Sequence, residues 1–83
     1  MKLLYFAWVR ERIGTGAEEI SLPNDVTTVP ALLTWLSTQS DGHKLALQDL
    51  TRLRIAVNEC YVRGDHAVTD ADEVAIFPPV TGG

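Results

Sequence analysis

The sequence predicts an α+β fold in which a mixed sheet of four to five strands packs against one main helix. Three observations lead to this prediction. The chain has 83 residues, 46% of them apolar, which suits one globular domain with a single modest core. Short apolar or alternating segments near both ends are typical of strands, whereas the middle of the chain has the spacing of an amphipathic helix. We expect one domain over residues 1–77 and a flexible tail over residues 78–83.

Two strands are predicted at the N-terminal end, where they form a hairpin. Residues 3–9 are rich in aromatic and branched side chains and too short for a typical helix, so we interpret them as a central strand. Polar residues follow, and then Gly14 and Gly16, which end this strand. Residues 17–22 alternate polar and apolar positions, and this pattern predicts the second strand.

The main helix is predicted to begin at Thr28 and to run to about Gln39. Thr28 can cap the N-terminus, and Pro30 falls in the first turn, where its missing N–H donor is not needed. The apolar stripe of this helix consists of Leu32, Leu33 and Leu36. A shorter helical segment is predicted over residues 43–50.

The remaining strands are predicted in the last third of the chain. Residues 53–58 alternate cleanly, and a short strand follows near residues 61–62. The last strand covers residues 73–77 and ends at Pro78 and Pro79, because neither proline can donate to a strand ladder. We expect the first and last strands to lie side by side at the centre of a sheet that is covered on one face.

Composition argues against several classes of function. The net charge of −4 and the absence of a basic cluster argue against binding to nucleic acid. No apolar run approaches the ~20 residues that cross a bilayer, and no charged leader precedes the first strand, so we expect no membrane association and a cytoplasmic location. The two histidines lack the paired spacing of metal ligands, and no metal site is predicted.

Large apolar side chains are predicted on the uncovered face of the sheet. If residues 3–9 form one strand, alternation places three of them on the face opposite the helix: Leu4, Phe6 and Trp8. Ala75 and Phe77 would share this face from the last strand, and Tyr61 would extend it. Either loops cover these side chains or they form a partner interface, and their number in so small a domain favours the interface.

The segment after Phe77 has the properties of a projecting tail. Pro78, Pro79, Val80, Thr81, Gly82 and Gly83 carry no charged side chain. Fully extended, six residues span ~20 Å, enough to insert into a buried site of another protein. Charged groups would have to be desolvated on the way into such a site. For the two glycines considered alone, the alternative interpretation is a chain end that has no function.

The α-carboxylate of Gly83 is the expected reactive group of this tail. A carboxylate is a poor electrophile at neutral pH and must be activated before it reacts. Adenylation by ATP would give a mixed anhydride, open to attack by a sulfur nucleophile or by an amine. The sequence contains no phosphate-binding loop, so a separate enzyme would consume the ATP, and we expect no cofactor bound to this chain.

Both ends of the chain resemble a known family. The ending from residue 70 through Phe-Pro-Pro-Val-Thr-Gly-Gly, and the start with Phe6-Ala7, Val9-Arg10-Glu11 and Gly14, are similar to the small subunits of molybdopterin synthase, the ubiquitin-like sulfur carriers. The resemblance covers the whole chain and implies a β-grasp fold. It also implies adenylation of Gly83 by an E1-like enzyme, and conversion to a thiocarboxylate with sulfur from a donor.

The resemblance implies a specific partner as well. The large synthase subunit, which holds the catalytic site, would receive the tail and use its sulfur to form molybdopterin from cyclic pyranopterin monophosphate. Two small and two large subunits would form a heterotetramer, docked through Phe6, Tyr61 and Phe77. Two alternatives share the activated glycine: a ubiquitin-like modifier joined to lysines, and a sulfur carrier of another pathway such as thiamine synthesis.

Overall fold

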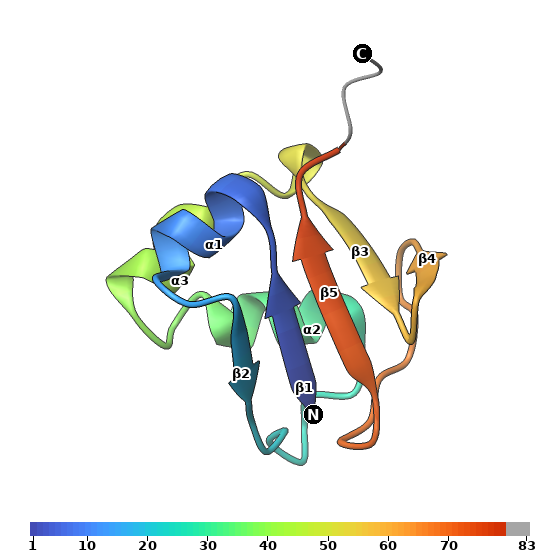
Figure 1. Ribbon diagram of the computed structural model, residues 1–83. Coiled ribbons are helices and arrows are strands. Elements are labelled where there is room, and N and C mark those ends of the chain that lie inside the picture. The colour runs from blue at the N-terminus through green and yellow to red at the C-terminus, as the bar shows by residue number, and fades with distance from the viewer. Residues whose placement is uncertain (80–83) are drawn as a thin grey trace.

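The computed structural model describes residues 1–79 as a five-stranded mixed sheet with three helices (Figure 1). The strands are β1 (Lys2–Tyr5), β2 (Ala17–Glu19), β3 (Arg54–Val57), β4 (Cys60–Val62) and β5 (Glu73–Phe77), in the sheet order β2-β1-β5-β3-β4. The helices are α1 (Ala7–Ile13), α2 (Val29–Leu36) and α3 (Asp41–Ala46), and a 3-10 turn, η1, covers Leu50–Arg52. The predicted α+β class is confirmed, with two short helices beside the main one.

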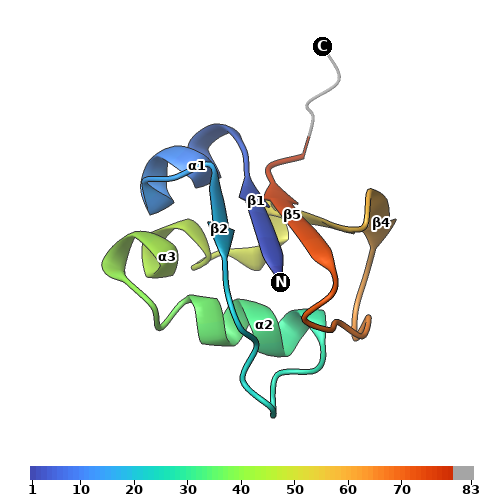
Figure 2. The ribbon, with the colours of Figure 1, turned by 60° about the horizontal axis from the view of Figure 1, so that its bottom comes forward.

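The first and last strands form the centre of the sheet, as predicted. β1 and β5 run parallel, with Leu3 opposite Val74 and Tyr5 opposite Ile76. These four side chains are almost completely buried. They share the buried core with the apolar side chains of α2, and α2 crosses one face of the sheet (Figure 2). β2 and β3 flank the central pair in antiparallel orientation.

Helix α2 begins as the sequence indicates and ends earlier than expected. Thr28 Oγ1 accepts a hydrogen bond from the Ala31 N–H at 3.3 Å, and Pro30 lies in the first turn. The helix ends at Leu36, because Ser37 and Thr38 turn their hydroxyls back to donate to carbonyl oxygens of the last turn, each at 2.6 Å. These side-chain bonds take the place of a further helical turn.

The strand predicted over residues 3–9 is wrong in its second half. β2 pairs with β1 only as far as Leu4, so a longer β1 would lack a partner on that side. Instead the chain turns at Ala7, which has a φ of 53°, and enters α1. Val9 is completely buried there, and Gly14 ends the helix in the left-handed conformation. Burial of Val9 by the helix thus prevails over the local preference for a strand.

The second predicted helical segment is displaced rather than absent. α3 begins at Asp41, because Ser40 caps it by accepting a hydrogen bond from the His43 N–H at 3.1 Å. It ends at Ala46, and Leu50 belongs to the separate turn η1. The second strand is also shorter than predicted and ends at Glu19. All predicted strands are nevertheless present, and β5 has the bounds that the sequence indicates.

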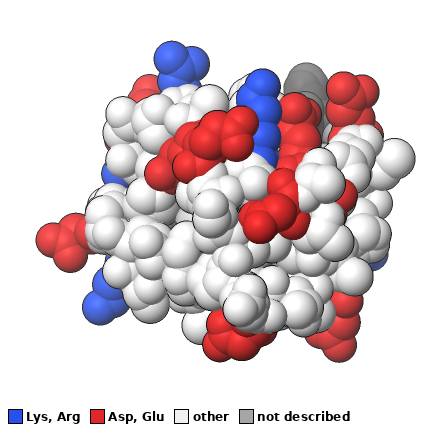
Figure 3. All heavy atoms as spheres, turned by 90° about the horizontal axis from the view of Figure 1, so that it is seen from below, with Lys and Arg blue, Asp and Glu red and all other residues white. Residues whose placement is uncertain are grey.

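Acidic side chains gather at the end of the molecule that carries the N-terminus and the turn before β5 (Figure 3). Asp72 orders this turn by accepting hydrogen bonds from the Asn58 side chain at 2.9 Å and from the Thr69 N–H at 2.8 Å. These bonds lower the pKa of Asp72 below its ordinary value, the bond from Asn58 contributing most. The Asn58 side chain in turn accepts from the Glu73 N–H at 3.0 Å, which fixes the start of β5.

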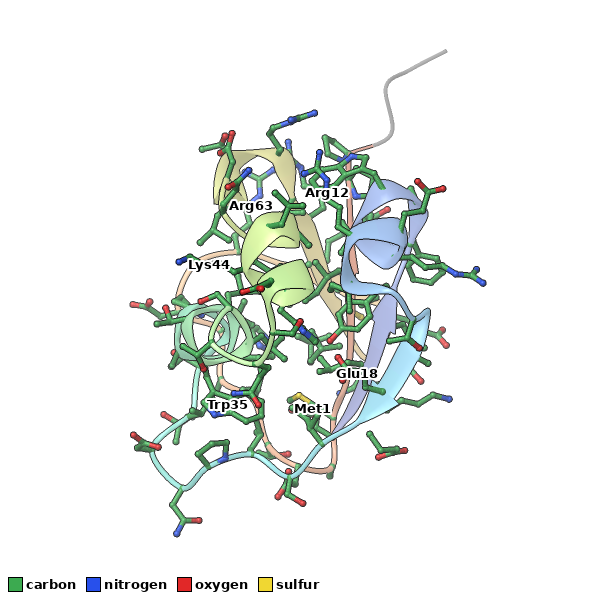
Figure 4. All side chains as sticks on the ribbon, turned by 90° about the vertical axis from the view of Figure 1, so that its left-hand side faces the viewer. Met1, Arg12, Glu18, Trp35, Lys44 and Arg63 are labelled. Carbon is green, nitrogen blue, oxygen red and sulfur yellow. The ribbon has the colours of Figure 1, made fainter. Side chains whose placement is uncertain are left out.

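A polar network joins β1, β2 and α3 inside the fold. Glu18 projects from β2 toward the interior (Figure 4), where its Oε2 accepts a hydrogen bond from the Tyr5 hydroxyl at 2.6 Å. The same oxygen lies 2.7 Å from Nε2 of the buried His43. Nδ1 of His43 lies 2.6 Å from Ser40 Oγ. With Glu18 ionised, Nε2 carries a proton and donates to it, so each group in this network has a partner.

Candidate docking site at the end of the last strand

Three aromatic side chains meet on the uncovered face of the sheet. The ring centroids of Phe6 and Phe77 are 6.5 Å apart at an interplanar angle of 83°, and those of Tyr61 and Phe77 are 5.7 Å apart. Phe6 is 48% exposed and Tyr61 77% exposed, so the cluster is open to solvent. We call Phe6, Tyr61 and Phe77 the aromatic cluster. The structure brings together the three residues that the sequence and the resemblance indicate as an interface.

The sheet register places these rings. Ile76 faces the core, so the next residue along β5, Phe77, faces outward. Tyr61 reaches the same face from β4, where it lies opposite Ala56, which in turn lies opposite Ala75. Phe6 follows directly after β1, and its N–H donates to the Ile76 carbonyl at 3.3 Å.

Small side chains at the base of the cluster leave a shallow hollow. Its volume is about 570 Å³. It is lined by Phe6, Ala7, Tyr61, Ala75, Phe77, Pro78 and Pro79. None of these residues carries a charge, and the Tyr61 hydroxyl is the only polar side-chain group among them. Such a surface suits the binding of apolar side chains from a partner.

The other two predicted interface residues have different outcomes. Leu4 lies on the outer face of β1, opposite Ala75, and is half-buried there. Trp8 does not lie on the face of the sheet as predicted, because it belongs to α1, where it packs against the hydrophobic core. Ala75 lines the hollow, as expected from its place between two core-facing residues of the last strand. Ala7 also lines the hollow but was not singled out from the sequence.

The predicted tail begins beside this hollow. β5 ends at Phe77, and Pro78 and Pro79 line the hollow directly after it. Val80, Thr81, Gly82 and Gly83 lie outside the described residues, so tail insertion and the reactive role of Gly83 stay predictions. Because Phe77 belongs to the cluster, any partner bound there would contact the chain directly before the tail that leads to Gly83.

Other features of the described part of the chain bear on function only indirectly. No helix within residues 1–79 has the length and apolar character that crossing a bilayer requires. Over the same residues, no three His, Cys, Asp or Glu side chains are grouped so that they could hold a metal ion. Cys60 is exposed in β4 with a free thiol.

Comparison with known proteins decides the family. The sequence profile described as the ThiS family matches residues 3–83, which is nearly the whole chain. The chain belongs to the ThiS family. Within this family, it is 52% identical to the molybdopterin synthase sulfur carrier subunit of Escherichia coli (strain K12), over all of this chain and 99% of that protein. It is 40% identical to the protein of the same name from Haemophilus influenzae, with the same coverage. The resemblance to the small subunits of molybdopterin synthase is thereby confirmed.

Solved structures agree with the ThiS-family assignment. A Pyrococcus furiosus protein titled as a candidate molybdopterin converting factor, subunit 1, is 31% identical, with a TM-score of 0.68 over 95% of each chain. SAMP1 from Haloferax volcanii is 25% identical, with a TM-score of 0.63 over 100% of this chain and 98% of that one. The β-grasp fold implied by the resemblance is confirmed.

Proposed function

We propose that this chain is the sulfur carrier subunit of a molybdopterin synthase. The observation that carries the proposal is the continuity of β5: its last residue, Phe77, belongs to the aromatic cluster, and the uncharged tail follows at once. A partner that binds the cluster therefore receives the tail in the same encounter. The full-length identity to two proteins named as sulfur carrier subunits of this synthase supports the choice of pathway.

The proposed chemistry takes place on the C-terminal carboxyl group of Gly83. A separate E1-like enzyme joins this carboxylate to the AMP moiety of ATP and releases pyrophosphate. A sulfur donor then displaces AMP and leaves a thiocarboxylate. Adenylation is needed because an unactivated carboxylate has no leaving group that sulfur could displace. The chain contributes no catalytic side chain to these steps and binds no cofactor of its own.

The large subunit of the synthase is the proposed acceptor. It binds the aromatic cluster, admits Pro78 through Gly83 into its catalytic site, and transfers sulfur from the thiocarboxylate to cyclic pyranopterin monophosphate. The absence of side-chain charge after Glu73 supports insertion, because no ionised side chain has to leave water. We propose a heterotetramer of two small and two large subunits in the cytoplasm.

Intact-mass analysis tests the proposed chemistry. The purified chain is incubated with the activating enzyme, ATP and a sulfur donor, and its mass should rise by the difference between one sulfur and one oxygen atom. A variant that lacks Gly83 should show no gain, and its melting temperature should equal that of the wild type. An unchanged mass in the wild type contradicts the proposal. A large loss of stability in the shortened variant would show that the tail contributes to the fold instead.

Replacing Phe77 with aspartate tests docking. Burial of a phenylalanine contributes ~1.5–3 kcal/mol, and a carboxylate in its place must also be desolvated. Affinity for the large subunit should therefore fall at least ~10-fold, since each ~1.4 kcal/mol is tenfold. Leu45→Asp is the matched control, because Leu45 is 48% exposed on α3 and does not line the hollow. If the Phe77 variant and the wild type bind the large subunit with equal affinity, the cluster is not part of the interface.

A ubiquitin-like modifier is the second candidate function. Its motivation is the similarity in fold and sequence to SAMP1 of Haloferax volcanii, whose abbreviated name stands for small archaeal modifier protein 1. An activated Gly83 attacked by an amine instead of sulfur would give an amide to lysine. Mass spectrometry of proteins from cells that express the chain would reveal lysine adducts ending in its C-terminal glycine, and their absence would leave only the sulfur carrier function.

A further inference from the structure

The Trp8 ring carries two guanidinium groups that come from distant parts of the chain. The guanidinium carbon of Arg12 lies 4.4 Å from the ring centroid and that of Arg52 lies 5.2 Å from it. Arg12 follows Trp8 by one helical turn in α1, whereas Arg52 ends η1. Guanidinium groups at such distances from a tryptophan make cation–π contacts. We call Trp8, Arg12 and Arg52 the arginine stack.

The arginine stack has no ion-pair partner within residues 1–79. The ion pairs in this part of the chain join His43 to Glu18 and the N-terminal amine to Asp70, at nitrogen–oxygen distances of 2.7 and 3.5 Å. Asp49 lies near Arg52, but its Oδ1 accepts hydrogen bonds from the Thr51 N–H and hydroxyl at 3.1 and 2.6 Å. The two guanidinium groups repel each other on the same ring. A carboxylate from a partner could pair with them without first displacing another carboxylate.

The arginine stack lies at the end of the molecule where the tail begins. α1, η1 and the C-terminal end of β5 share this end in Figure 1, and the acidic side chains of Figure 3 gather at the opposite end. Phe6, a member of the aromatic cluster, immediately precedes α1. On the other side, η1 leads into β3, whose first residue, Arg54, lies opposite Phe77. Arg54 is exposed and adds a third guanidinium to the same end.

We propose that the arginine stack binds carboxylates on the large subunit, at the rim of the recess that takes the aromatic cluster and the tail. This inference rests on the proposed function, because it extends the same interface. The occupant follows from charge complementarity: a chain of net charge −4 keeps two arginines without an ion-pair partner at the end of the molecule where the tail begins. A polyanion such as nucleic acid fits poorly, because the acidic end of this small molecule would repel it.

Rim charges of this kind act mainly on the rate of association. Opposite charges steer an encounter, and they raise association rates by about tenfold or more at low ionic strength. Salt removes this effect, because the screening length falls from ~30 Å at about 0.01 M to ~3 Å at about 1 M. The aromatic cluster, in contrast, should act on dissociation and depend little on salt. The two parts of the interface can therefore be separated kinetically.

The test compares association rates with the large subunit across this range of salt. The double variant Arg12→Gln and Arg52→Gln should associate about tenfold more slowly at low salt and as fast as the wild type at high salt. Lys2→Gln with Lys44→Gln removes the same charge from exposed positions outside the arginine stack and should have a much smaller effect. Arg12→Lys with Arg52→Lys retains the charge and should retain most of the salt dependence. Circular dichroism confirms that each variant is folded.

Three results would overturn the inference. If the glutamine variant associates at the wild-type rate at low salt, the arginine stack takes no part in docking. If the lysine-to-glutamine control slows association equally, net charge alone is responsible. If the wild type does not bind the large subunit at all, the proposed function fails together with the inference. Wild-type binding and sulfur transfer, combined with an unaffected glutamine variant, would refute only the inference.

Discussion

Replacing Glu18 with glutamine tests the polar network that joins β1, β2 and α3. The change preserves the size of the side chain and removes its charge. In the wild type, one oxygen of Glu18 accepts hydrogen bonds from Tyr5 at 2.6 Å and from His43 at 2.7 Å. Both donors belong to buried residues. Glutamine can still accept from them, so the variant isolates the contribution of the negative charge.

The expected loss follows from these two bonds. A hydrogen bond to a charged group contributes about 1.5–3 kcal/mol, and one between neutral groups about 0.5–1.5 kcal/mol. The Glu18 side chain is 27% exposed, so water supports part of its charge and the loss belongs at the lower end. We expect the free energy of unfolding to fall by about 1–2 kcal/mol. For a domain of this size, each kcal/mol lowers the melting temperature by about 4–8 °C.

The effect should depend on pH, and its sign follows from the pKa of Glu18. Partial burial raises this pKa. The hydrogen bonds from Tyr5 and His43, together with the electrostatic attraction of His43, outweigh burial and lower the pKa below the ordinary value of 4.5. A carboxylate with a lowered pKa stabilises the fold above its ordinary value, and the contribution is lost as pH falls through the folded pKa. The wild type should therefore lose its advantage over the glutamine variant as the pH falls below the ordinary value of 4.5 and through the lowered pKa of Glu18.

Urea unfolding at neutral and acidic pH measures both quantities. Glu19→Gln is the matched control, because this neighbouring residue is exposed and should change stability by less than about 0.5 kcal/mol. Burial and the bond to Glu18 also raise the pKa of Tyr5, so Tyr5 stays a neutral donor throughout. The reasoning would be refuted by equal stability of the Glu18 variant and the wild type at pH 7, or by a difference that persists unchanged in acid.

Two further predictions concern backbone geometry. Gly42→Ala should destabilise the protein by about 1–2 kcal/mol in urea unfolding, because the added Cβ would clash with the Arg12 carbonyl oxygen and force α3 away from α1. Gly16→Ala, whose Cβ meets only the flexible Arg10 side chain at 3.2 Å, is the control, and equal losses would disprove the explanation. Glu59→Gly should raise the melting temperature by relieving up to ~1 kcal/mol of strain, because Glu59 has a φ of 69° in the turn between β3 and β4. Glu59→Ala should not raise the melting temperature. A lower melting temperature for the glycine variant would contradict the explanation by backbone strain.

Much of the fold follows from local patterns. The bounds of β5, the Thr28 cap and the apolar stripe of α2 agree with the sequence prediction, because each rests on neighbouring residues alone. The missed helix α1 shows the limit of this approach. Val9 and Ile13 have helical spacing and Gly14 follows, but the aromatic and branched residues before them also fit a strand. The short β2 decided between these alternatives, and its length depends on contacts made elsewhere.

The candidate site divides in the same way. Alternation along a single strand was enough to place Phe77 on the outer face, and the composition of the following residues was enough to indicate an uncharged tail. The position of Trp8 could not be predicted, because it depends on where β1 ends. Its contact with Arg52 joins segments more than forty positions apart in the sequence, and no local pattern indicates it.

The sequence by itself determined the class of fold, the character of the tail and the residue on which chemistry is expected. These are properties of residue type and spacing, which do not change when the chain folds. Only the tertiary structure decided which rings meet in the aromatic cluster, that Trp8 lies on a helix, and that two arginines share its ring. The physical reason is that long-range packing selects among local conformations of similar free energy, and it alone brings distant side chains into contact.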